Sequence, residues 1–159
     1  MMATQDNAFI HALAREQNAW LCLIDILHHE EEALIQGDSD KLDSLNEPKL
    51  NQLQALGKYI HARNTSLAVL GFEPNHQGMS AWVRQGAEEQ ITALWQHLCA
   101  CELDAQSLNK RIGTLIEMRL TATRQALNVL LTCATDRGGI YSHDGMALGL
   151  TGGRALYAA

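Results

Sequence analysis

The sequence is short of basic residues and prolines and lacks a long apolar run, and these shortages exclude several classes of protein. Its 12 Lys and Arg are outnumbered by 18 Asp and Glu, which gives a formal net charge of −6. No basic patch is left to displace counterions from phosphates, so we expect no nucleic-acid binding. No run approaches about 18 apolar residues, so we expect no membrane insertion. The 47% hydrophobic content is too high for a generally disordered chain.

The sequence also lacks an export signal, because its N-terminus "MMATQDNAF" has no basic segment followed by an apolar one. We therefore expect a cytoplasmic protein whose cysteines (Cys22, Cys99, Cys101 and Cys133) are reduced thiols. Cys99 and Cys101 lie about 200° apart around a helix, so they cannot share one metal ion.

Glycine is unevenly distributed, and its distribution marks a boundary. Six of the 12 glycines lie at or after Gly138, whereas the residues before it follow helical periodicity. The composition predicts a helical domain over residues 1–133 and a flexible C-terminal tail over residues 134–159.

Apolar periodicity predicts three helices. The first spans about residues 4–36, and "QGDSD" is a tight turn leading into the second, which Pro48 should kink or restart and Gly71 should end. "FEPNHQGM" is expected to be a loop, followed by a third helix from about Ser80 to Cys133 with weak points at Gly86 and Gly113. No alternating strand pattern occurs. We predict an all-α fold: an elongated antiparallel helical hairpin with a long third helix packed along it, and then the tail.

The seams expected to face the core combine spacings of three and four residues. The first helix contributes Ile10, Leu13, Gln17, Trp20, Ile24, Leu27, Glu31 and Leu34; the second Leu42, Leu45, Leu53, Leu56, Ile60, Leu67 and Leu70; the third Ile91, Leu94, Leu98, Cys101, Ala105, Leu108, Ile112, Leu115, Arg119, Ala122, Ala126 and Val129.

The third helix has more apolar surface than one seam needs. Four residues, Ile116, Leu120, Leu127 and Leu131, lie to one side of the seam and widen the apolar face. Two interpretations remain open: the other helices wrap around this face, or it is a groove for a partner helix.

No catalytic or cofactor-binding constellation is present. "HHEEE" (His28 to Glu32) resembles a metal cluster, but a di-iron bundle needs two Glu-x-x-His pairs on separate helices as well as two further glutamates. Asp25 and His28 are the nearest approach to one such pair, and the third helix offers none. His28 and Glu32 more simply form a surface pair. "GLTGG" lacks the lysine of a phosphate-binding loop. We therefore expect neither an enzyme nor a metal site.

The tail contains one candidate contact point. Gly138 and Gly139 loosen the chain before Ile140 and Tyr141, and "SHDG" can turn it afterwards. This pattern presents an Ile-Tyr pair on a tether, where tyrosine makes an effective anchor. The alternative is that Tyr141 folds back on the end of the bundle.

Three ordered stretches resemble the FlgN family of flagellar type III export chaperones. The family's acidic helix, Gly-Asp turn and second helix resemble the stretch "HEEEALIQGDSDKLDSLNEPKLNQLQAL". Its third helix resembles "SLNKRIGTLIEMRLTATRQALNVL", and its tail resembles "IYSHDG". The resemblance implies a non-enzymatic cytoplasmic chaperone. It would bind C-terminal segments of the hook–filament junction proteins FlgK and FlgL and deliver them to the export gate FlhA.

The same resemblance implies where the partners bind. Cargo binding falls on the later third helix, at Ile116, Leu120, Leu127, Leu130 and Leu131. Docking to the export gate falls on Ile140 and Tyr141. The competing interpretations are a structural coiled-coil scaffold or adaptor without export cargo, and a metal- or cofactor-binding helical bundle.

Overall fold

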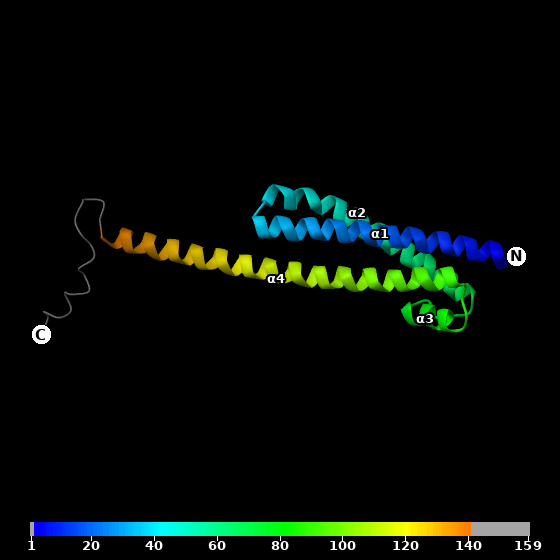
Figure 1. The fold of residues 1–159 in the computed structure, drawn as a ribbon. Helices are drawn as coiled ribbons and strands as arrows, with labels where there is room; N and C mark the ends of the chain where they lie inside the picture. Colours follow the sequence, from blue (N-terminus) through cyan, green and yellow to red (C-terminus); the bar gives the residue numbers. More distant parts are fainter. Residues whose placement is uncertain (1, 141–159) are drawn as a thin grey trace, which may run out of the picture. The chain divides into compact units, whose positions relative to one another are not determined.

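The part of the chain that the structure describes folds into four α-helices. The computed structural model describes the backbone of residues 2–140 and the side chains of residues 7–135. Its elements are α1 (Met2–Gln36), α2 (Ser39–Val69), α3 (His76–Arg84) and α4 (Glu89–Ile140) (Figure 1). The predicted all-α fold is confirmed. Two structural units are distinguished, Met1–Leu115 and Ile116–Ala159, and the first contains the packed core.

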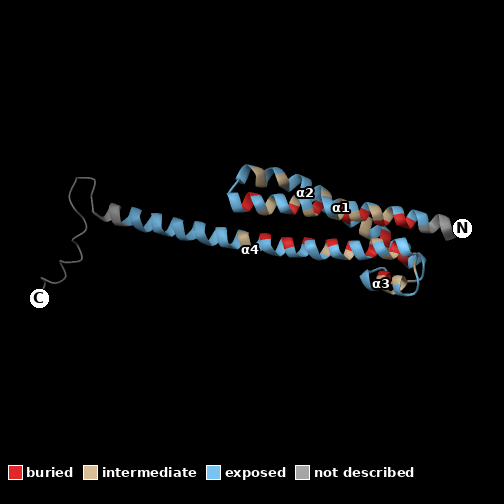
Figure 2. Ribbon diagram, viewed as in Figure 1, coloured by how far each residue is buried: buried red, intermediate tan, exposed pale blue. Residues whose placement is uncertain are grey.

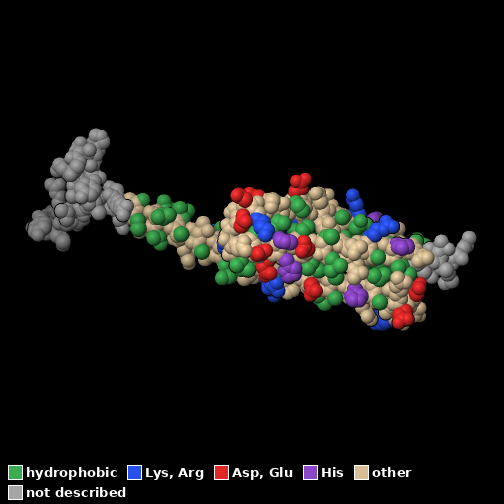
Figure 3. All heavy atoms as spheres, turned by 45° about the horizontal axis from the view of Figure 1, so that its top comes forward, with side chains coloured by type: hydrophobic (Ala, Val, Ile, Leu, Met, Phe, Trp, Pro, Cys, Tyr) green, Lys and Arg blue, Asp and Glu red, His purple; other side chains and the backbone are tan. Residues whose placement is uncertain are grey.

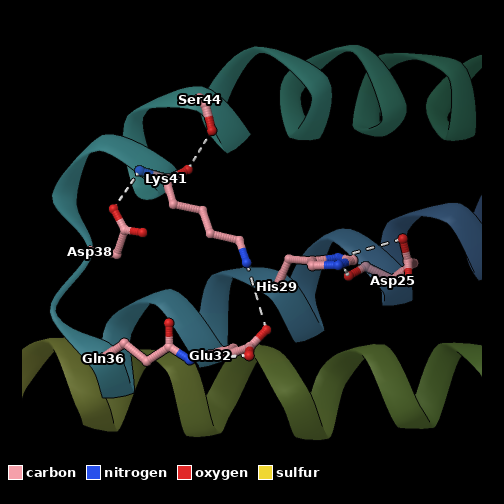
Figure 4. Close-up of polar contacts among 7 residues, drawn as sticks. All are labelled: Asp25, His29, Glu32, Gln36, Asp38, Lys41 and Ser44. Carbon is pink, nitrogen blue, oxygen red and sulfur yellow. Dashed lines mark hydrogen bonds and ion pairs between the residues drawn. The ribbon is translucent and has the colours of Figure 1, made fainter.

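The turn between α1 and α2 forms where the sequence predicts it. Gly37 takes a φ of 77°, a left-handed conformation that glycine adopts without steric cost. Asp38 caps α2 by accepting a hydrogen bond from the backbone N–H of Lys41 at 3.0 Å, and Ser44 donates its hydroxyl to the Lys41 carbonyl at 2.7 Å (Figure 4). The cap satisfies a backbone donor that the first turn of a helix leaves free.

α2 continues through Pro48, so of the predicted kink or restart the restart is wrong, and the kink stays a prediction. In the next turn of the helix, two side chains contact α1. Lys49 forms an ion pair with Glu30 at 2.6 Å, and the side-chain amide of Gln52 donates to the Ala19 carbonyl at 2.9 Å. The predicted seam of α2 also includes residues that are not buried. The buried residues of α2 are Leu56, Arg63 and Leu67. Leu53 and Leu70, which the pattern placed on it, are exposed.

The helix predicted from Ser80 to Cys133 is interrupted, and part of the predicted loop before it is helical. α3 begins at His76, where the Asn75 side chain accepts a hydrogen bond from the Gly78 N–H at 2.8 Å. Gly78, which signals a loop in the sequence, is needed here because a Cβ would collide with the Glu73 carbonyl oxygen.

Gly86 separates α3 from α4 with a φ of 102°, which confirms it as a point of interruption. Gly113, the other predicted weak point, lies within α4. The helix also runs past Cys133 to Ile140, so that Gly138 and Gly139 are helical rather than a loose hinge. The predicted boundary between residues 133 and 134 as a division into domains stays a prediction.

Two apolar clusters form the core of the first unit, and both join α1, α2 and α4 (Figure 2). One is centred on Leu13, Leu67, Ile91 and Trp95 and is covered by α3 through Met79. The other includes Leu23, Leu27, Leu56, Leu108 and Ile112. The predicted α4 seam is buried at Ile91, Leu98, Cys101, Ala105, Leu108 and Ile112. Its continuation is wrong, because Arg119, Ala122, Ala126 and Val129 are exposed.

A candidate protein-binding face on the last helix

The second unit displays a row of large apolar side chains on α4. Their exposed fractions are 46% for Ile116, 48% for Leu120, 54% for Leu127, 67% for Leu130 and 56% for Leu131. Single exposed leucines are common on protein surfaces, but a contiguous apolar row is typical of a site that contacts another molecule. These side chains are exposed along the helix, and their use as a docking surface stays a prediction.

These five residues share one side of the helix, and we call them the apolar face. At about 100° per residue, Ile116, Leu120, Leu127 and Leu131 fall within about 60° of one another, and Leu130 lies about 40° beyond Ile116. Figure 3 shows hydrophobic side chains gathered on this part of α4. Met118 and Val129 are also exposed, at 64% and 62%, but project from the opposite side of the helix.

The structure describes only the backbone of one of the two residues expected to dock at an export gate. Ile140 is the last residue of α4, and its side chain lies outside the described residues. Tyr141 lies outside them entirely. The assignment of both residues therefore stays a prediction.

Glutamates of the acidic run "HHEEE" form contacts from α1 to α2 and α4. Glu30 pairs with Lys49 of α2, and Glu31 forms two hydrogen bonds with Arg111 of α4, at 2.7 and 3.0 Å. The hydrogen bonds from Arg111 lower the pKa of Glu31 below its ordinary value of 4.5. Glu30 and Glu31 thus link α1 to two different helices.

The predicted surface pair of His28 and Glu32 is wrong. The Glu32 carboxylate pairs instead with Lys41 of α2 at 3.6 Å, across the hairpin turn (Figure 4). The neighbouring His29 ring nitrogen Nδ1 lies 2.8 Å from the Asp25 carbonyl oxygen. The i, i+4 contact observed here joins His29 to Asp25, so both residues of the predicted pair differ from the observed ones.

A buried ion pair is the main feature that sequence reasoning missed. Arg63 of α2 contacts Glu16 of α1 at 3.1 Å and lies 4.9 Å from the centroid of the Trp95 ring. Burial raises the pKa of Glu16, and the positive charge of Arg63 acts in the opposite direction. A signal was available, because Arg63 occupies the helical position between Ile60 and Leu67 on the predicted seam.

One further pair of reactive side chains joins α3 to α4. The His76 ring nitrogen Nε2 lies 3.4 Å from the Cys99 Sγ, and burial raises the pKa of the Cys99 thiol. Within the searched part of the chain, no group of three His, Cys, Asp or Glu side chains could hold a metal ion. The four cysteines are free. This pair is best understood as a contact that fixes α3 on the core.

The described residues form an all-α fold whose last helix, α4, exposes an apolar face. No helix in the searched residues is long and apolar enough to cross a bilayer. A family model described as "FlgN protein" matches residues 1–149, and the chain belongs to the FlgN family. No curated protein and no solved structure gives a significant match. The family is one of chaperones for flagellar export rather than of enzymes.

Proposed function

We propose that this chain is a cytoplasmic chaperone for hook–filament junction proteins of the FlgK and FlgL kind. It binds their C-terminal segments before export and delivers them to the cytoplasmic domain of the export gate FlhA. The observation that carries the proposal is the apolar face of α4, which leaves five large side chains available to a partner. Membership of the FlgN family supports the export role.

The physical fit is that of one amphipathic helix packing on the exposed apolar face of another. Cargo segments that are amphipathic helices would associate with one another if left free, and an exposed apolar face can cover their apolar side instead. Because the cargo must later be released, the contact should be moderate in size and affinity. An interface built on one helix face is suited to this requirement.

Calorimetry with the C-terminal segment of a FlgK-like or FlgL-like protein tests cargo binding. We expect about one segment to bind per chaperone. Absence of binding, together with a constitutive oligomer of the chaperone, would instead support a coiled-coil scaffold. Such a scaffold would use the same apolar face to associate with other copies of the chain.

Gate docking is tested separately, with the Tyr141→Ala variant in complex with cargo. We expect the complex formed by the variant to be no longer retained on the cytoplasmic domain of FlhA. If Tyr141 is an aromatic hot spot, its loss weakens the binding free energy by about 2 kcal/mol or more. Cargo affinity and melting temperature should stay unchanged. Full retention would exclude the docking role, and a melting temperature lower by several degrees would show that Tyr141 packs on the folded protein.

A further inference from the structure

Two arginines flank the apolar face of α4. Relative to Ile116, Arg119 lies about 60° to one side, and Arg124 lies about 80° to the other, beyond Leu131. They are separated by about 7.5 Å along the helix axis. Both side chains are exposed. An apolar stripe with a guanidinium on each edge is thus the surface that a docking helix would meet.

Both arginine side chains are unpaired in the part of the chain that the structure describes. Lys41, Lys49, Arg63 and Arg111 are committed to ion pairs with the glutamates of α1. Among the described residues, Arg119 and Arg124 form neither an ion pair nor a side-chain hydrogen bond. The only acidic side chain between Ile116 and Thr135 is Glu117, on the same edge as Arg124 but about 10 Å away along the axis.

We propose that the apolar face accepts an amphipathic helix carrying an acidic side chain on each flank, paired with Arg119 and Arg124. This inference rests on the proposed cargo binding and adds which helices the face prefers, namely those with acidic side chains on both flanks. The apolar residues supply contact area but discriminate poorly, since many amphipathic helices offer leucines at this spacing. Guanidinium groups at the edges add charge-assisted and often bidentate hydrogen bonds to carboxylates.

Charge complementarity explains why the arginines matter on an acidic protein. With a net charge of −6, the chain as a whole repels acidic segments. The two arginines make the edges of the docking face locally positive, so this face attracts acidic segments and repels basic amphipathic helices. The rest of the surface attracts basic helices. Charges at the rim of an interface act mainly on association rate, salt dependence and partner choice.

The test uses the full chain and three designed helical peptides with the same leucines, spaced to match the apolar face. Their flanking positions carry glutamate, glutamine or lysine. We expect the glutamate peptide to bind about tenfold more tightly than the lysine peptide at low salt, with the glutamine peptide between them. The difference should shrink at 0.5 M salt, at which the Debye length falls to about 4 Å.

Charge reversal identifies the residues responsible. The Arg119→Glu, Arg124→Glu variant should prefer the lysine peptide. A matched control, Lys58→Glu with Arg84→Glu, makes the same change in net charge at exposed sites on α2 and α3 and should keep the original preference. An equal change in both variants would show that net charge alone selects the peptide, which would overturn the inference.

Failure of the inference is distinguishable from failure of the proposed function. If all three peptides bind equally and Leu120→Asp with Leu127→Asp abolishes their binding, the face docks helices but the arginines do not select them. If no peptide binds, the face is not a helix-docking surface and both proposals fall. A concentration-dependent dimer that excludes the peptides would show that a second copy occupies the face.

Discussion

Glu16 and Arg63 form an ion pair inside the helical core, with 3.1 Å between Glu16 Oε1 and Arg63 Nη1. The other Glu16 oxygen and the Arg63 Nε have no hydrogen-bond partner. A pair of this kind adds little net stability but becomes costly when one partner is removed. In other helical bundles, buried polar residues fix which residues of neighbouring helices face each other.

We predict that Arg63→Met lowers the free energy of unfolding by about 3 to 5 kcal/mol, because it strands the buried Glu16 carboxylate. The double change Glu16→Leu with Arg63→Met should recover most of this loss. Both variants lose the contact between Arg63 and Trp95, so their difference isolates the stranded charge. Urea unfolding provides the measurement, and equal stability of the two variants would contradict this account.

The contact between Glu31 and Arg111 should depend on pH. Its hydrogen bonds lower the pKa of Glu31 in the folded state, so its contribution is fully present above the ordinary value of 4.5. That contribution is lost as the pH falls through the lowered folded-state pKa. Glu31→Gln should therefore melt below the parent at pH 7 and converge with it in acid.

The control for this comparison is Glu47→Gln, an exposed α2 residue that forms no ion pair in the described part of the chain. Its melting temperature should follow that of the parent at every pH. A difference between Glu31→Gln and the parent that persists unchanged in acid would show that the pair does not act through ionisation.

Gly78 should not tolerate a larger residue. Gly78→Ala places a methyl group against the Glu73 carbonyl oxygen at the start of α3, and we expect a loss of about 1 to 3 kcal/mol. Gly57→Ala is the matched control, because no atom lies within 4 Å of its added Cβ in the middle of α2. That change should stabilise the protein by about 0.5 to 1 kcal/mol. Thermal melts that rank the two variants in the reverse order would refute the assigned geometry.

The sequence was sufficient where one strong signal decided the structure. Apolar periodicity identified α1, α2 and the α4 seam as far as Ile112, and the Gly37–Asp38 turn followed from capping chemistry. The sequence was insufficient where contacts between residues distant in the chain determine the structure. The contacts of Lys49 and Gln52 with α1 follow Pro48, and the constraint between Gly78 and Glu73 depends on the chain's path in space. Neither is visible in spacing.

The candidate site shows the same limit. Helical spacing placed Ile116, Leu120 and Leu127 together on one side of a helix. Spacing alone could not decide whether that side was covered, because a core seam and a docking face have the same pattern. The buried pair of Glu16 and Arg63 was missed for a related reason: a charged residue at a seam position is ordinarily assigned to solvent.

The most direct test of the central claim compares two double variants on opposite sides of α4. Leu120→Asp with Leu127→Asp alters the apolar face, whereas Met118→Asp with Val129→Asp places the same charges on the far side. Calorimetry with the C-terminal segment of a junction protein, alongside circular dichroism to confirm equal helix content, should show binding lost in the first variant. An uncompensated charge buried in the contact costs several kcal/mol, enough to abolish a micromolar complex. The second variant should bind as the parent does. Unchanged binding in the first, or equal loss in both, would contradict the assignment of cargo binding to this face.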